Sequence, residues 1–124
     1  MEVFEYSIIR YVPQVEREEF INIGVIVFSK RFQFLDVKYQ VDTHKVSVIG
    51  EEEHLPLISN YMNSWKLICK GDESGGSIAR QDIAYRFRWL VAARSTIIQA
   101  SRPHPGRCND PAKVLEDLFS KYVK

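Results

Sequence analysis

Residues 20–29, FINIGVIVFS, constrain the fold more than any other stretch of this chain. The run is almost entirely apolar and rich in β-branched side chains, whereas a strand with one wet face would alternate with polar residues. It therefore predicts a strand that is buried on both faces and lies at the centre of a sheet. Its odd-numbered positions would form one apolar face, and its even-numbered positions the other. Within it, Gly24 indicates a close approach of another backbone or a bulge.

Three further strands are predicted around this one. Residues 3–12 alternate in polarity and end at Pro13, which cannot donate to a strand ladder. Residues 32–39 alternate apolar side chains with Asp36 and Lys38, so this strand should lie near an edge of the sheet. Residues 95–100 would form a short fourth strand. The short connections between the first three strands favour an antiparallel meander.

Helices are predicted to cover this sheet. An apolar stripe with helical spacing runs through residues 51–69. It consists of Leu55, Ile58, Met62, Trp65 and Cys69, and is widened by Leu57, Tyr61 and Ile68. A second helix is expected at residues 81–93, and a last one begins with Asp110 as its N-cap and Pro111 in its first turn. Residues 42–50 fit a short helix or a strand, and we favour the helix because Asp42 or Thr43 could cap it.

The remaining segments are expected to be loops. Residues 71–77, GDESGGS, have the composition of a mobile loop, and residues 102–106 would connect the last strand to the last helix. Together the elements predict one α+β domain over residues 1–124. It would have a mainly antiparallel sheet of about four strands, covered by two to three helices.

Charge is distributed unevenly along the chain although the net charge is only +1. Residues 1–60 contain ten acidic and six basic residues, whereas residues 80–107 contain six arginines and one acidic residue. The two parts could pair with each other on folding. Alternatively, the arginines could present a basic surface to an acidic or phosphate-bearing partner.

The composition also bears on the compartment. No run reaches the roughly 18 apolar residues that a membrane span needs, and the N-terminus carries acidic residues where a signal peptide needs basic ones. Cys69 and Cys108 are too few for a disulfide framework. We therefore expect a cytoplasmic protein.

One candidate site lies at the start of the central strand. Arg17, Glu19 and Asn22 could form a polar site there that binds a ligand or a partner. In the alternative interpretation, Arg17 pairs with Glu19 to close the loop, and the Asn22 amide satisfies a backbone group inside the sheet.

A second candidate site is the arginine segment, which we define as Arg86, Arg88 and Arg94 together with Ser95. Guanidinium and hydroxyl groups could bind phosphate or carboxylate, and the interleaved aromatic residues could stack on bases. Alternatively, the arginines are solvated or paired with acids. We expect Arg88 to be structural, because Phe87 and Trp89 flank it, and Arg86 or Arg94 to be available to a partner.

Nothing in the sequence predicts a metal site, a cofactor or a catalytic residue. His104 and Cys108 are four residues apart, which is not a metal-binding spacing, and a cysteine–histidine pair rests on this spacing alone. No nucleophile elbow or HExxH pattern occurs. An enzyme is therefore the less favoured class.

Four stretches together resemble a known family. They are YSIIRYVP (6–13), REEFINIGVIVF (17–28), FRWLVAARSTIIQ (87–99) and DPAKVLEDLF (110–119). In these stretches the chain resembles the bacterial domain-of-unknown-function family 3037, over nearly its whole length. The resemblance implies a single domain without an established activity, and it suggests a protein partner, a HipA-like kinase.

Three functions follow as hypotheses. The leading one is a small accessory or protein-interaction module. The second is a ligand-binding domain or enzyme acting on a phosphate- or carboxylate-bearing substrate, which a pocket enclosing both Glu19 and Arg88 would favour. The third is nucleic-acid binding, which needs one continuous exposed stripe of arginines along residues 86–102.

Overall fold

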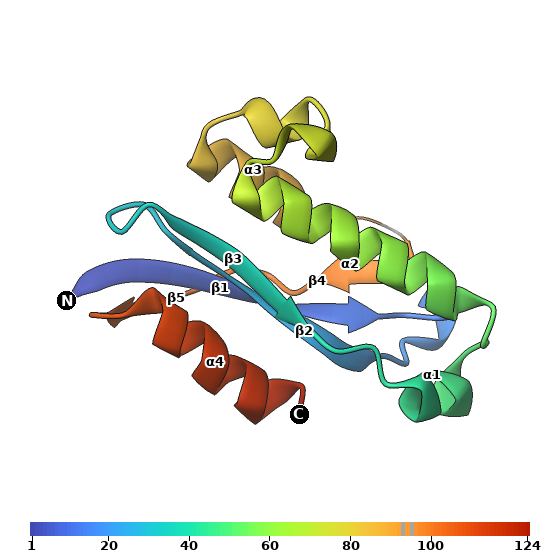
Figure 1. Ribbon diagram of the computed structural model, residues 1–124. Coiled ribbons are helices and arrows are strands. Elements are labelled where there is room, and N and C mark those ends of the chain that lie inside the picture. Colours follow the sequence, from blue (N-terminus) through green and yellow to red (C-terminus); the bar gives the residue numbers. More distant parts are fainter. Residues whose placement is uncertain (93, 95) are drawn as a thin grey trace.

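The computed structural model describes residues 1–92, 94 and 96–124, which form an antiparallel five-stranded sheet with helices on both faces (Figure 1). β3 (Phe34–Tyr39), β2 (Ile21–Ser29) and β1 (Glu2–Tyr11) lie side by side in that order. β4 (Ile98–Ala100) and β5 (His104–Cys108) both pair with the other side of β1, one at each of its ends. The α+β class, the interior position of β2 and the edge position of β3 are confirmed.

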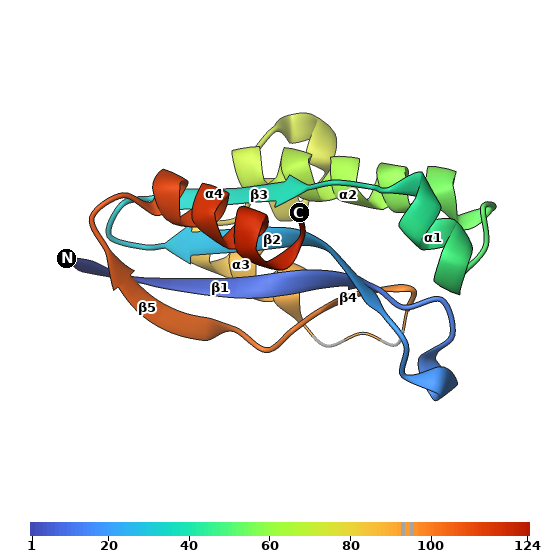
Figure 2. The ribbon, with the colours of Figure 1, turned by 90° about the horizontal axis from the view of Figure 1, so that it is seen from below.

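The helices bury two separate apolar clusters, one on each face of the sheet. α2 (His54–Lys70) and α3 (Ile83–Val91) pack over one face, and α4 (Pro111–Tyr122) packs over the other (Figure 2). α1 (Thr43–Ile49) follows β3, with Asp42 as the N-cap that accepts from the Lys45 amide. The described part of the chain also contains three short 3₁₀ turns: η1 (Val15–Arg17), η2 (Glu73–Gly75) and η3 (Ile78–Arg80).

β2 is buried on both faces, as predicted, but a bulge changes which side chains share a face. Ile9 pairs with Gly24 and the next residue, Arg10, pairs with Asn22, so Ile23 is an extra residue on β2. Val25 and Val27 pack towards α4, whereas Ile23 packs in the cluster under α2 and α3. The prediction of a single odd-numbered face is therefore wrong beyond the bulge. Gly24 meets the expected close approach, since a Cβ there would lie 2.9 Å from the Lys38 carbonyl oxygen.

Several element boundaries differ from the predictions. α2 begins at His54 rather than at residue 51, α3 ends at Val91, and β4 begins only at Ile98. The predicted loop at residues 102–106 partly forms β5, which has the sequence HPGRC. Pro105 is tolerated there because β5 lies at the edge of the sheet.

The segment predicted to be a mobile loop has defined structure. In residues 71–77 the Asp72 carboxylate accepts hydrogen bonds from the Ser74 amide and hydroxyl, and η2 follows. Gly71 ends α2 in the left-handed conformation, with a φ of 71°. The mobility of the segment stays a prediction.

Candidate functional site

The arginine segment is divided among three different environments. Arg86 is half-buried, and its Nη1 atom donates to the carbonyl oxygens of Ile68 and Cys69 at 2.8 and 3.0 Å, at the carboxyl end of α2. It lies three residues after Ile83 and four before the buried Leu90. This spacing places Arg86 on the stripe of α3 that faces the interior of the protein. Of the two arginines of which one or the other was expected to be available to a partner, Arg86 is thus held against α2.

Arg88 lies outside that stripe and is exposed. Its Nη1 and Nη2 atoms donate to the two carboxylate oxygens of Glu5 on β1, at 2.9 and 2.5 Å. This bidentate pair joins the acidic and basic parts of the chain, as one of the two charge interpretations requires. Arg88 was expected to be structural because aromatic residues flank it, but the contact that ties it to the fold is this exposed pair with Glu5.

Arg94 closes the carboxyl end of α3. Its Nη1 atom donates to the Leu90 carbonyl at 2.7 Å, and Nη2 donates to the Trp89 carbonyl. The guanidinium also lies over the Trp89 ring, 4.6 Å from its centroid. Ser95, the fourth member of the predicted site, lies outside the described residues.

The residues at the start of β2 do not form one site. Arg17 Nε and Glu19 Oε1 are 2.8 Å apart in an exposed ion pair. Asn22 instead donates from Nδ2 to the Tyr122 carbonyl at the end of α4, 3.0 Å away. The ion pair is that of the alternative interpretation, in which Arg17 and Glu19 close the loop. The Asn22 amide does satisfy a backbone group, but that group belongs to α4 and not to the interior of the sheet.

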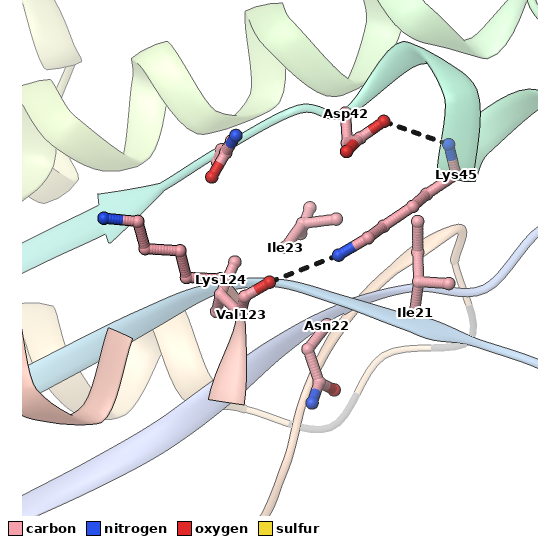
Figure 3. Close-up of a pocket in the computed structure, with 8 residues that line it drawn as sticks. Ile21, Asn22, Ile23, Asp42, Lys45, Val123 and Lys124 are labelled. Atoms are coloured by element: carbon pink, nitrogen blue, oxygen red, sulfur yellow. Dashed lines mark hydrogen bonds between the residues drawn. The ribbon is translucent and has the colours of Figure 1, made fainter. Parts of the chain in front are cut away.

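A small cavity next to Asn22 is shown in Figure 3. It measures about 100 Å³, and Lys45 reaches across it to donate to the Val123 carbonyl at 3.3 Å. Small-molecule sites usually measure about 300 Å³ or more, so this cavity has room for only a few water molecules.

A larger cavity of about 340 Å³ lies between α2 and α3, and we call it the α2–α3 groove. It is lined by Asn60, Tyr61, Ser64, Trp65, Ile68, Trp89 and Arg94. Trp89 is 39% exposed and Tyr61 36%, whereas Trp65 is buried at its base. Trp89 and Tyr61 thus form the rim of the groove. Leu57, one turn before Tyr61, and Tyr85, one turn before Trp89, are exposed as well.

The groove includes residues that sequence reasoning assigned to the core. Leu57 and Tyr61 were expected to widen the buried stripe of α2, and that expectation is wrong. The sequence did contain a signal of their exposure. The apolar arc of α2 that includes both residues is wider than the part of a helix that packing against one sheet face buries. Trp89 of α3 lies at the rim of the groove.

A polar pocket of about 350 Å³ lies where β1 meets the start of α2, and sequence reasoning missed it. Arg17, Glu51 and His54 contribute to its lining. Behind it, the buried Tyr11 hydroxyl lies 2.5 Å from His54 Nδ1, and burial raises the pKa of Tyr11. Gly50 permits this contact, because a Cβ there would lie 2.0 Å from the Tyr11 hydroxyl. The tyrosine–histidine contact fixes α2 against β1.

The cysteines are buried and show no sign of reactivity. Burial raises the pKa of both the Cys69 and the Cys108 thiols. His104 and Cys108 lie four positions apart along β5, which places their backbones about 13 Å from each other. The cysteine–histidine pair is therefore excluded. Across residues 1–92, 94 and 96–124, no three metal-ligating side chains gather closely enough to hold an ion.

The geometry defines a class of protein: a small α+β domain in which helices cover both faces of one antiparallel sheet and two of them enclose an aromatic groove. None of its described helices is long and apolar enough to cross a membrane. The chain belongs to the family described as protein of unknown function (DUF3037), whose model matches residues 6–123. The resemblance noted in the sequence is thus confirmed. No curated protein and no solved structure matches the chain significantly.

Proposed function

We propose that this protein is an interaction module that docks a segment of a partner protein in the α2–α3 groove. The observation that carries the proposal is the half-exposed pair Trp89 and Tyr61 on the rim, beside the Arg94 guanidinium. Tryptophan, tyrosine and arginine are the residues most enriched at the energetic centres of protein interfaces. Exposed apolar residues of neighbouring turns, Leu57 and Tyr85, would extend the contact surface.

The groove favours a segment with an apolar anchor next to an acidic residue. Its volume of about 340 Å³ suits one or two large side chains, and its base is the apolar surface of Trp65 and Ile68. One charged residue, Arg94, lines it, and the hydrogen bonds to α3 hold that cation in place. A partner carboxylate could pair with the Arg94 guanidinium at a low cost in conformational entropy, because the arginine side chain is already held in place.

The other two hypotheses receive less support from the geometry. Arg86 faces α2 and Arg88 pairs with Glu5, which interrupts the exposed arginine stripe that nucleic-acid binding would need. Glu19 pairs with Arg17, and none of the pockets described above contains both Glu19 and Arg88. The family resemblance makes a HipA-like kinase the first candidate partner.

The test compares matched variants in binding to a purified partner. Candidate partners are a HipA-like kinase from the organism that makes this protein and proteins captured from its cells. Each candidate is purified and titrated against the wild-type protein. Trp89→Ala and Tyr61→Ala should each weaken binding about tenfold or more. Phe32→Ala, which changes an exposed aromatic residue in the turn between β2 and β3, should leave binding within about twofold. Equal binding by all three variants would refute the docking site.

A further inference from the structure

Arg10 carries a charge that forms no ion pair and no side-chain hydrogen bond within the described part of the chain. It lies on β1 directly opposite Asn22, and so on the same face of the sheet as α4. α4 ends at Tyr122, beside Asn22, and does not extend over the next row of side chains. The Arg10 Nε atom is buried without a hydrogen-bond partner.

A pocket of about 260 Å³ surrounds this guanidinium. Besides Arg10 it is lined by Val12, Val15, Glu18, Phe20 and Gln99. The guanidinium lies over the Phe20 ring, 4.4 Å from its centroid, and Phe20 is 46% exposed. Gln99 donates from Nε2 to the Thr96 carbonyl, so Arg10 is the main donor that faces the pocket. The site therefore combines a positioned cation with an apolar wall.

We infer that this pocket binds a small carboxylic acid with an apolar body. The carboxylate would accept two hydrogen bonds from the Arg10 fork, and the apolar body would lie against Phe20 and Val12. A half-buried charge is costly unless it is paired. Glu18 lines the same pocket but forms no ion pair with Arg10, so a bound anion would supply the pairing that the site lacks. One arginine beside the acidic Glu18 suits a singly charged carboxylate better than a doubly charged phosphate.

This site is independent of the proposed docking function. It lies on the α4 face of the sheet, whereas the α2–α3 groove lies between helices that cover the opposite face. Binding of a small acid to Trp89→Ala, and binding of the partner protein to Arg10→Gln, should both be unchanged. The failure of one proposal would therefore be distinguishable from the failure of the other.

The test is a titration with phenylacetate in which NMR monitors the Arg10 Nε–H resonance. We expect saturable shifts of that resonance, and binding about tenfold or more weaker for the neutral isostere phenylacetamide. Arg10→Gln should lose binding to the same extent. Arg107→Gln, which removes an equal charge from an exposed site on β5, should stay within about twofold.

Several results would overturn the inference. They are equal binding of phenylacetamide and phenylacetate, unchanged binding by Arg10→Gln, or displacement of phenylacetate by inorganic phosphate at equal concentration. The absence of saturable binding to the wild-type protein would overturn it as well. If Arg10→Gln does not fold, Phe20→Ser serves in its place, because Phe20 is half-exposed and forms the apolar wall. Phenylacetate binding that is unaffected by Phe20→Ser would also refute the site.

Discussion

The Nη1 atom of Arg86 on α3 lies 2.8 Å from the carbonyl oxygen of Ile68 on α2. The last carbonyl groups of a helix have no partner within it. Here the Ile68 carbonyl accepts from the Gly71 amide and also from Arg86, a side chain of α3. The adjacent Cys69 carbonyl accepts from the same atom. This contact fixes the angle between the two helices, and so the shape of the groove between them.

Replacement of Arg86 should therefore destabilise the fold. Arg86→Ala removes charge-assisted hydrogen bonds to buried carbonyls and should lower the free energy of unfolding by about 1.5–3 kcal/mol. Arg88→Ala is the matched control, because its exposed pair with Glu5 should contribute no more than about 1 kcal/mol. Urea denaturation measures both. If Arg86→Ala lowers the free energy of unfolding no more than the control does, the hydrogen bonds of Arg86 to the end of α2 do not stabilise the fold.

The central strand yields a second prediction. Val25 is fully buried against the α4 cluster, so Val25→Ala should lower the free energy of unfolding by about 1–3 kcal/mol through lost burial and the cavity left behind. Val48 on α1 is exposed, and Val48→Ala should change stability by less than about 0.5 kcal/mol. Chemical denaturation that finds the two variants equally stable would contradict the central position of β2.

The buried thiol of Cys69 predicts a loss of stability in alkali. Burial raises its pKa in the folded state, whereas an unfolded thiol ionises near pH 8.5. Above that pH the unfolded state loses a proton that the folded state keeps, so stability falls as pH rises. For one such group, the free energy of unfolding falls by at most about 1.4 kcal/mol per pH unit.

The measurement is denaturation between about pH 8.5 and 9.5, below the ionisation of an unfolded tyrosine near 10. Cys69→Ala should show a shallower decline than the wild-type protein, and Cys108 should account for part of the remaining slope, since burial raises its pKa too. An identical slope in Cys69→Ala would contradict the predicted linkage.

Much of the fold could be predicted because local signals and tertiary contacts agree. The apolar run around Val25 indicated a strand with two buried faces, and Asp110 with Pro111 marked the start of α4. The bulge at Ile23 could not be predicted, because it depends on the pairing register with β1. β5 was missed since its HPGRC sequence lacks strand propensity, and pairing with β1 alone makes it a strand.

The candidate site was harder to predict than the fold. The composition of the arginine segment was clear from the sequence, but the direction of each side chain depends on the helix phase, which places Arg86 towards α2 and Arg88 towards Glu5. The width of the apolar arc on α2 indicated that part of it stays uncovered, but which part is exposed depends on where α3 packs against α2, and so the exposure of Tyr61 itself could not be predicted. Periodicity identifies an apolar face of a helix, but it does not show how much of that face is covered.

The proposed docking surface can be observed directly through its tryptophan. The chain contains two tryptophans, so a protein labelled with 5-fluorotryptophan should give two ¹⁹F resonances, one from Trp65 and one from Trp89. The variant Trp89→Phe assigns them, and an unlabelled partner adds no signal. Trp89 is the more exposed of the two, and its resonance should therefore be the more sensitive to solvent in the free protein.

The decisive measurement is the Trp89 resonance during titration with the unlabelled partner that the binding experiment identifies. The account predicts that it moves as the complex forms and loses its sensitivity to solvent, because the partner segment covers the α2–α3 groove. A complex that forms, as judged by line broadening of the Trp65 resonance, while Trp89 keeps its chemical shift and its solvent exposure would contradict the account.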